Sequence, residues 1–590
     1  MSRVLFIFKG ILNPNFWLAY VNIDFSLDMH KNSGELFFAQ RSSRMSRKPV
    51  FFVLIVVVAI FTAISCSQKT HDIEAAVASL NTDELAQDVE ILASDEFEGR
   101  FPASPGEEKT INFLAEEFEK VGLMPENGDS FFQEVPLVEI TASPETKLVI
   151  TGGAQPMEFA FTYDFVGVTL RVQEKVEVVD SEMIYVGYGI VAPEYEWNDY
   201  EGLDVKGKTV VMLVNDPGFA TQDPDLFNGR AMTYYGRWTY KYEEAARQGA
   251  ACAIIIHETA PAAYGWGVVQ NGWTGPNFSL VSEDGNASRC AVEAWITLET
   301  TQSIFEAAGK DYDELKKAAE KPGFKAVPLA LKATTGLENS LRKTVSSNVI
   351  GLLPGSTRAD EYIIYTAHWD HFGRNPNLEG DQIYNGALDN ATGTAALIEL
   401  AEAFKKLGSP PLRSILFLAV TAEEQGLLGS DYYARNPIYP LEKTVAVINI
   451  DSLNIYGRMK DIRIVGYGKS DLDDYVMDYA QEVGRIVLPN ATPEKGSFYR
   501  SDHFPFAKQG VPALSAGSGV QHLENGEEWG LAQQENYIRE KYHKPTDEFD
   551  PSWDLTGARE DLEMYFKLGY RLSMETTFPG WKEGSEFKRK

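Results

Sequence analysis

The feature that most constrains this chain is a regular alternation of apolar runs and amphipathic segments after residue 346. Five short runs are almost wholly apolar, at 349–353, 362–366, 415–420, 445–450 and 462–465. Segments with helical spacing of apolar residues accompany them, at 391–406, 472–483 and 559–574. Continuous apolar strands that alternate with helices are typical of an α/β fold whose sheet is buried on both faces. We therefore predict a mixed, mostly parallel central sheet flanked by helices.

The stretch before this region has a different pattern. Residues 82–122 have helical periodicity, whereas 143–335 contain short β-type runs separated by Gly, Pro, Asn and Asp, with one helical piece near 242–247. The sequence thus predicts one α/β domain, formed by 76–142 and 336–580, that is split by a β-rich insertion at 143–335.

The N-terminal 65 residues read as an upstream segment followed by a signal peptide. Residues 50–64 are fifteen uncharged, mostly apolar residues behind Arg47 and Lys48, a length that suits a signal core better than the roughly 20 residues of a membrane-spanning helix. The tetrapeptide AISC at 63–66 resembles a bacterial lipoprotein signal, which implies cleavage before Cys66 and a lipid on that residue. We expect Met45 to be the start, and a periplasmic or surface lipoprotein of the cell envelope that is held to the membrane only through Cys66. The alternative is a signal anchor with an incidental cysteine.

The charge of the chain excludes one class of partner. It has 54 Lys and Arg against 85 Asp and Glu, a net charge of −31. Loss of residues 1–65 would remove seven positive and three negative side chains and leave −35. Such a chain repels phosphate backbones, so no nucleic-acid partner is expected. Two cysteines, Cys252 and Cys290, remain after Cys66, and the sequence leaves open whether they pair, as it leaves open the oligomeric state.

Metal-ligand side chains follow three of the apolar runs directly. The run at 362–366 leads into His368 and Asp370, that at 415–420 into Glu423 and Glu424, and that at 445–450 into Asp451. Ligands of open α/β sheets collect beyond the carboxyl ends of strands, so these side chains are candidates for one site. A metal-bound histidine commonly donates its second N–H to a carboxylate, which suits His368 with Asp370.

Other candidates are weaker when taken alone. Asp389 lies in a Gly-bounded loop before a helix, where the alternative is an ordinary N-cap. His543 lies in a loop where a surface histidine would be unremarkable. His371 is not expected to be a ligand. The prediction depends on the conjunction of these residues.

Six motifs in order resemble the signature of the di-zinc aminopeptidase and glutamate carboxypeptidase family, within the metallopeptidases of clan MH. They are AHWD at 367–370, NGALDNATG at 385–393, AEEQGLLGS at 422–430, NID at 449–451, RSDHFPF at 500–506 and YH at 542–543. The resemblance covers roughly 80–140 and 340–578. The insertion, with DVKGKTVV at 204–211 and EAARQGA at 244–250, is similar to a protease-associated domain.

The resemblance implies two zinc ions and a specific role for each site residue. One zinc would be held by His368 and Asp451, the other by Glu424 and His543, with Asp389 bridging both. Glu423 would be the general base for a metal-activated water, and Asp370 would support His368. Tyr542 would help to stabilise the oxyanion, and Arg500 would contact the peptide substrate.

Several functions fit this signature. The first is an aminopeptidase, because the acidic groups around the metals can hold a substrate ammonium group. A carboxypeptidase or dipeptidase of the same family stays open, as does a glutaminyl cyclase with a single zinc. A receptor that has lost its catalytic residues is the non-enzymatic alternative. The insertion would cover the active site or provide a surface for association, and 264–277 is a candidate substrate-facing loop.

Overall fold

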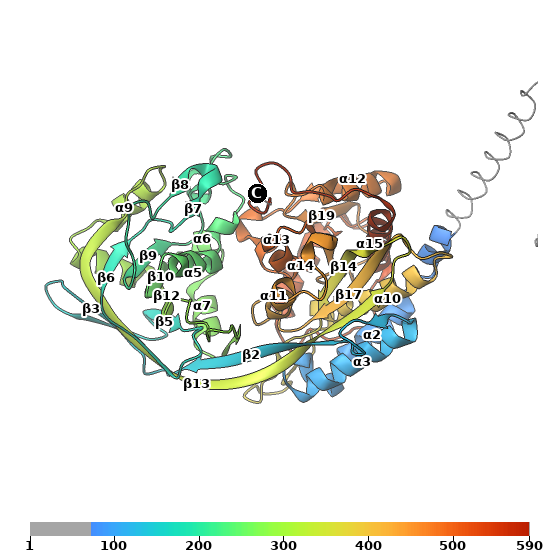
Figure 1. The fold of residues 1–590 in the computed structure, drawn as a ribbon, viewed down its shortest axis with the longest axis horizontal. Coiled ribbons are helices and arrows are strands. Elements are labelled where there is room, and N and C mark those ends of the chain that lie inside the picture. The colour runs from blue at the N-terminus through green and yellow to red at the C-terminus, as the bar shows by residue number, and fades with distance from the viewer. Residues whose placement is uncertain (1–71, 589–590) are drawn as a thin grey trace, which may run out of the picture. The chain divides into compact units, whose positions relative to one another are not determined.

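The computed structural model describes residues 72–588, which belong to a compact unit that spans 68–590. The predicted upstream segment, the signal peptide and Cys66 lie outside the described residues. Within 72–588, none of the helices is long and apolar enough to cross a bilayer. Figure 1 shows two lobes, each built on a sheet, which are joined by long strands.

The first sheet carries the predicted α/β core. Four neighbouring strands are parallel, in the order β17 (Arg413–Val420), β14 (Arg358–His368), β18 (Thr444–Asn449) and β21 (Ala513–Ser518). The last strands of this sheet are β19 (Asp461–Val465), antiparallel to β21, and β20 (Ile486–Pro489), parallel to β19. The predicted mixed, mostly parallel sheet is confirmed.

This sheet is buried on both faces, as its apolar strands require. Alternate residues of β17 point to opposite faces, so Phe417 joins one hydrophobic cluster and Leu418 another. The helices α2 (Thr82–Leu92), α3 (Pro105–Val121), α10 (Thr392–Lys405) and α15 (Thr556–Met574) contribute to the first cluster. Residues of α11 (Leu428–Arg435) and α13 (His503–Lys508) contribute to the second.

The insertion has more helix than its sequence predicts. Its sheet has four parallel strands, β6 (Lys175–Tyr185), β9 (Thr209–Leu213), β10 (Cys252–Ile256) and β12 (Val292–Ile296), with β5 (Phe165–Val168) antiparallel at β12. Besides the expected helical piece, α5 (Trp238–Arg247), it contains α7 (Trp266–Trp273), α8 (Leu298–Ala307) and α9 (Tyr312–Ala319). The segment 264–277, predicted to be a loop, is therefore largely the helix α7.

Two long strands connect the lobes. The 27-residue strand β13 (Val327–Leu353) pairs with β6 and β3 (Lys147–Thr151) in the sheet of the insertion and with β17 in the first sheet. Beside it runs β2 (Phe132–Ala142), paired along residues 339–349 (Figure 1). The boundary expected between 335 and 336 thus falls inside a strand that both sheets share.

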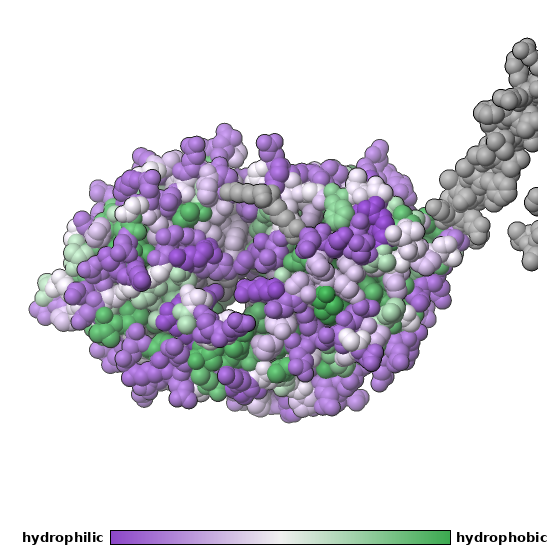
Figure 2. Space-filling view, in the orientation of Figure 1, coloured by the Kyte–Doolittle hydropathy of each residue, from purple (hydrophilic) through white to green (hydrophobic). Residues whose placement is uncertain are grey.

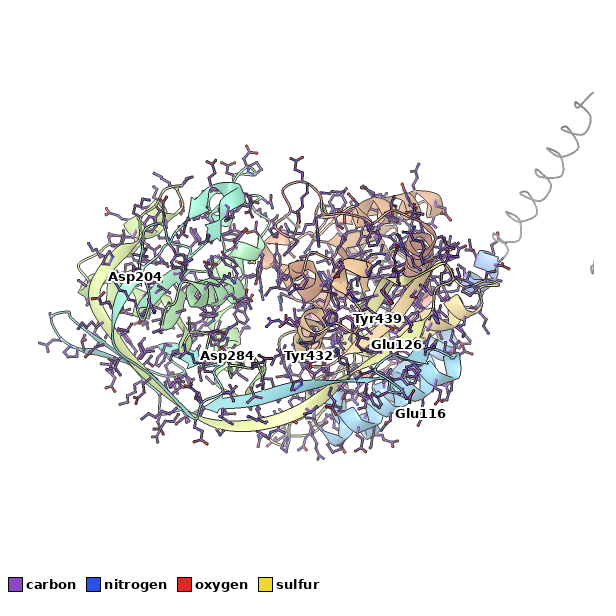
Figure 3. All side chains as sticks on the ribbon, viewed as in Figure 1. Glu116, Glu126, Asp204, Asp284, Tyr432 and Tyr439 are labelled. Carbon is purple, nitrogen blue, oxygen red and sulfur yellow. The ribbon has the colours of Figure 1, made fainter. Side chains whose placement is uncertain are left out.

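Smaller features complete the description. Cys252 and Cys290 are free and buried, and burial raises the pKa of Cys252 to about 12. The Tyr439 hydroxyl donates a hydrogen bond to Glu126, and both residues are labelled in Figure 3. Hydrophilic residues cover most of the face in Figure 2, in keeping with the charge of the chain.

Candidate metal centre

The predicted site residues converge at the carboxyl ends of the parallel strands. His368 ends β14, Glu423 and Glu424 follow β17, and Asp451 follows β18. Asp389 lies in the short turn η4 (Ala387–Ala391) before α10, and His543 lies in the loop after α14 (Gly526–Glu540). Loops from five places in the sequence therefore meet at one edge of the sheet.

The first group of ligand atoms surrounds His368. Its Nε2 lies 3.3 Å from Oδ1 of Asp389 and 3.6 Å from Oδ1 of Asp451. His368 is 1% exposed, and its Nδ1 lies 3.1 Å from the carbonyl oxygen of Asp370. The ring therefore presents Nε2 to the two carboxylates.

The second group uses the other oxygen of Asp389. Nε2 of His543 lies 3.3 Å from Oδ2 of Asp389 and 3.3 Å from Oε2 of Glu424. The five predicted ligands thus form two trios that share Asp389.

These distances fit zinc. A tetrahedral zinc with N and O ligands at about 2.0 to 2.2 Å sets neighbouring ligand atoms about 3.3 to 3.6 Å apart. The four contacts within the two trios lie at 3.3 to 3.6 Å. The donor set of imidazole and carboxylate groups also suits zinc, so the residues present fit two such ions.

The electrostatics point to bound cations as well. Burial raises the pKa of both Glu423 and Glu424 well above the usual range, and the neighbouring Asp389 raises that of Glu424 further. Although burial opposes it, contacts with His368 and His543 hold the pKa of Asp389 well below its ordinary value. Several buried carboxylates at one place need protons or cations to balance them.

Asp370 supports the loop of the glutamates more directly than it supports His368. Its carboxylate accepts the backbone N–H groups of Glu423 at 2.9 Å and of Glu424 at 3.4 Å, whereas its Oδ1 is 3.9 Å from Nδ1 of His368. Burial raises the pKa of Asp370 to about 6 despite these bonds. Its side chain therefore fixes the peptide groups that carry the predicted base and one predicted ligand.

Two residues that the sequence did not single out hold the loops together. The buried Arg100 donates to the carbonyl oxygens of Leu92, Trp369, Asn385 and Gly386, at 2.6 to 2.8 Å. No spacing signal marks it, because its acceptors are main-chain groups up to 286 residues away.

Asp547, which is 0% exposed, is the second such residue. Its carboxylate accepts the backbone N–H groups of Leu388 at 3.3 Å and Asp389 at 3.1 Å. It lies four residues after His543, so it ties the loop of one ligand to the turn of another. That spacing after the YH motif is the one signal for it in the sequence.

Tyr542 and Arg500 lie at the rim of the centre. The Tyr542 ring stacks on His543 with centroids 3.7 Å apart. Arg500 is exposed and precedes Ser501, whose hydroxyl donates to Oδ2 of Asp451 at 2.6 Å. Tyr542 is thus next to a predicted ligand and Arg500 next to a hydrogen-bond partner of one, and the polar group of neither side chain has a hydrogen bond within residues 72–588.

The insertion contributes Arg237 to this region. Arg237 is 9% exposed, its Nε has no hydrogen-bond partner, and its guanidinium forms no ion pair with any described residue. Burial brings the pKa of Arg237 to about 10, and the nearby Arg500 lowers it too. Two guanidinium groups, one from each lobe, therefore influence each other, and neither is paired with a carboxylate of residues 72–588.

His371 is brought to the centre although the sequence argued against it. It is fully buried, and its Nδ1 lies 2.7 Å from Oε1 of Glu424. It forms a third possible cation group with Asp389 and Glu424.

Comparisons with known proteins agree with this centre. Residues 348–566, which include all five predicted ligands, match the family model described as Peptidase family M28. Aminopeptidase NAALADL1 of Mus musculus is 35% identical over 138 residues, which are 22% of this chain and 17% of that protein. Aminopeptidase YwaD of Bacillus subtilis is 27% identical over 236 residues, 39% of this chain and 46% of that protein. The matched part spans less than half the length of either relative.

The solved structure of an aminopeptidase from Aneurinibacillus sp. strain AM-1 is also similar. It is 19% identical, with a TM-score of 0.48 over 86% of this chain and 97% of that chain. The segment 348–566, with the candidate metal centre at its strand ends, thus matches the model of peptidase family M28.

Proposed function

We propose that this chain is a zinc-dependent aminopeptidase that removes N-terminal residues from peptides. The observation that carries the proposal is the pair of ligand trios that share Asp389, with contacts of 3.3 to 3.6 Å. Two relatives that are named aminopeptidases support it.

The residues around the trios have roles that follow from their places. Zinc ions bound there would supply a Lewis acid and lower the pKa of a water molecule toward about 7. Glu423 accepts a proton from the attacking water and passes it to the leaving amine. The Tyr542 hydroxyl donates to the oxygen of the scissile carbonyl as negative charge develops on it. Asp370 keeps Glu423 in place through its backbone N–H.

The charges at the rim of the centre bear on which end of the peptide is recognised. The surplus of carboxylates around the trios suits a free N-terminal ammonium group, which favours an aminopeptidase. Arg237 beside Arg500 favours a second candidate, a carboxypeptidase or dipeptidase, since two guanidinium groups without an anion suit a substrate carboxylate. In either case we infer that the insertion, as a domain of the protease-associated kind, covers the site and supplies Arg237.

Peptides blocked at one end separate the two candidates. An aminopeptidase cleaves a peptide amidated at its C-terminus and spares one acetylated at its N-terminus, whereas a carboxypeptidase does the reverse. A dipeptidase spares both. The variant Arg237→Gln should raise KM for free-carboxylate substrates if the guanidinium pair binds that group. Arg230→Gln is the matched control, because Arg230 is already paired with Glu494 at 2.9 Å.

Metal content tests the proposal against a single-zinc glutaminyl cyclase and against a non-catalytic receptor. Two zinc ions per chain and chelator-sensitive hydrolysis are expected. One zinc with cyclisation of N-terminal glutamine would favour the cyclase, and no hydrolysis by zinc-loaded protein would favour the receptor.

The place in the cell is a separate proposal. We infer a lipoprotein of the cell envelope, supported by the AISC sequence and the apolar run before it. Cys66→Ser should abolish incorporation of labelled fatty acid and release the protein from membranes. A wild-type protein that takes up no fatty acid would contradict the anchor.

A further inference from the structure

The insertion contains a cavity that the proposed function does not use. Its volume is about 560 Å³, within the range of roughly 300 to 1,000 Å³ that is typical of small-molecule sites. It lies beyond the carboxyl ends of the parallel strands β9, β10 and β12, where Leu213, His257 and Thr297 line it. Ligands of open α/β sheets collect at this edge, so the place of the cavity is that of a binding site.

Most of the cavity wall is apolar. It includes the rings of Phe219 and Trp266 and the side chains of Val214 and Leu298. The polar atom of Trp266 is already used, since its Nε1 donates to the carbonyl oxygen of Thr162 at 3.3 Å. A ligand would therefore bury an apolar body, preferably an aromatic one, against this wall.

Two buried side chains of the cavity wall carry polar atoms without a partner. Tyr188 is 3% exposed, and its hydroxyl makes no hydrogen bond within residues 72–588. His257 is 5% exposed, and its Nε2 lies 3.1 Å from the carbonyl oxygen of Tyr264. A carbonyl oxygen only accepts, so Nε2 carries the proton.

The other ring nitrogen of His257 is therefore a hydrogen-bond acceptor. Burial lowers the pKa of His257, so the ring is neutral at pH 7 and Nδ1 keeps its lone pair. Nδ1 has no partner in the described part of the chain, and neither this atom nor the Tyr188 hydroxyl is fully enclosed by protein. Polar atoms of buried side chains are rarely left unpaired, so both point to an occupant of the cavity.

The charged residues of the cavity wall leave one negative charge uncompensated. Nζ of Lys316 donates to both carboxylate oxygens of Glu258, at 2.8 and 2.5 Å. Glu320, at the end of α9, forms no hydrogen bond or ion pair with any described residue. Burial first and the charge of Glu320 second raise the pKa of Tyr188, so this carboxylate lies near the phenol group. The net charge of the wall is therefore −1.

These groups favour a ligand with a positively charged donor. A primary ammonium group has three N–H donors and no acceptor, and the wall offers it Nδ1 of His257, the Tyr188 oxygen and the Glu320 carboxylate. The aromatic rings of the wall also attract a cation. A carboxylate ligand would be repelled by Glu320 and would have to displace Glu258 from Lys316.

We propose that this cavity binds a primary amine with an apolar body, whose ammonium group is held by Glu320, Tyr188 and His257. The apolar body lies against Phe219 and Trp266. The inference does not depend on the proposed peptidase activity, because no residue of the candidate metal centre lines the cavity. A free arylalkylamine and the N-terminal residue of a peptide share this chemistry, and the experiment separates them.

Three probes of similar shape separate recognition of charge from burial of the apolar body. They are 2-phenylethylamine, 2-phenylethanol and 3-phenylpropionate, and each is titrated into the full chain by calorimetry. Phenylalaninamide, a mimic of an N-terminal residue, is the fourth probe. It is measured with 2-phenylethylamine in the variant Glu423→Gln, so that hydrolysis does not consume it.

The variants alter the cavity alone. Glu320→Gln removes the charge, Tyr188→Phe removes the hydroxyl, and Ala260→Trp fills the cavity from the short helix that borders it. The controls are Glu299→Gln, an exposed carboxylate outside the cavity wall, and Ala318→Trp, an exposed position of α9 outside it. Thermal unfolding of each variant shows whether it is folded.

The amine should bind the wild type at least about tenfold more tightly than the alcohol, and the carboxylate should bind most weakly, because hydrogen bonds to charged groups are the stronger ones. Glu320→Gln should weaken binding of the amine by about tenfold or more and leave that of the alcohol unchanged. Tyr188→Phe should weaken binding of the amine by about fivefold. Ala260→Trp should abolish binding of both, and the controls should bind as the wild type does.

Several outcomes overturn the inference. Equal affinities of the wild type for the amine and the alcohol, or an affinity for the amine that Glu320→Gln does not change, would exclude recognition of the ammonium group. Unchanged binding of the amine to Ala260→Trp would place it elsewhere on the chain, and no binding at millimolar concentration would exclude the site. If the amine binds as expected, tighter binding of phenylalaninamide identifies a peptide N-terminus as the ligand, and weaker binding identifies a free amine.

Discussion

The carboxylate of Asp370 accepts the backbone N–H of Glu423 at 2.9 Å. One acidic side chain thus fixes the main chain at the start of the loop that carries the proposed base. Its second oxygen accepts the next N–H, of Glu424, at 3.4 Å. The direction in which both glutamates leave the strand is therefore set by a residue on a neighbouring strand end.

Asp370→Asn should impair turnover more than metal binding. The amide keeps one acceptor but places its NH2 group against a backbone N–H, so one of the two bonds is lost. We expect kcat to fall by about 10- to 100-fold, with two zinc ions retained. Steady-state kinetics and elemental analysis of one preparation check this. Wild-type kcat in this variant would show that Glu423 does not depend on Asp370.

Glu423→Gln should remove the general base and leave the centre intact. We expect turnover to fall by on the order of 100-fold or more, because glutamine cannot accept the proton of water. Zinc content should stay at two per chain. Near-normal turnover in a fully loaded variant would assign the proton transfer to another group.

Asp389→Ala should cost both metal ions, since its two oxygens face different trios. Asp451→Ala, which alters one trio only, is the matched comparison and should lose one. Zinc is counted after gel filtration in metal-free buffer. Two equivalents in the Asp389 variant would contradict the bridging role.

The variant Asp547→Ala should leave Asp389, the predicted bridging residue, less firmly held, although no predicted ligand is itself replaced. Its removal leaves the backbone N–H groups of Leu388 and Asp389 unpaired in a buried place, a cost of about 1 to 3 kcal/mol for each. We expect a lower midpoint of urea unfolding and weaker zinc binding. Asp547→Asn, which retains one acceptor, should be intermediate, and equal effects of both variants would argue against this cause.

Stability should fall as pH rises from about 5 to 8, in part through Glu399. Burial first, and nearby carboxylates second, raise the pKa of Glu399 from 4.5 to about 8. The folded protein therefore keeps a proton that the unfolded chain releases, and the stability due to this group is lost as pH rises through the folded pKa. Glu399→Gln keeps the acceptor for the Asn81 N–H and removes the titration. The wild type should lose about 4 kcal/mol more than the variant between pH 5 and 8.5, by urea unfolding. Equal losses would exclude Glu399 as a source.

The strands and the places of the candidate ligands in the fold could be predicted for the same reason. Runs of apolar residues mark strands that are buried on both faces, and polar residues directly after them lie at one edge of the sheet. The runs at 415–420 and 445–450 fall in β17 and β18, with Glu424 and Asp451 behind them. In this part of the chain the local sequence therefore predicts where each candidate ligand lies in the fold.

Other parts depend on contacts between distant segments and were missed. Arg100 bonds to carbonyl oxygens, which any residue can offer, so nothing in the sequence around its acceptors identifies it. The place of His371 could not be predicted, because its proximity to Glu424 arises only when two loops meet. The helices α8 and α9 were not recognised within a stretch that reads as short strands and turns.

The shared strand β13 was hidden in a similar way. From 332 to 343 it carries polar residues at many positions, so only its last apolar segment was recognised. Its first half belongs to the sheet of the insertion and its second half to the sheet of the candidate metal centre. The insertion therefore cannot be excised without disrupting the rest of the fold, because cuts at 143 and 335 would divide the hydrogen-bonded strand β13 in two. Thermal denaturation should accordingly be a single cooperative transition for both lobes, and limited proteolysis should release neither as an independently folded fragment.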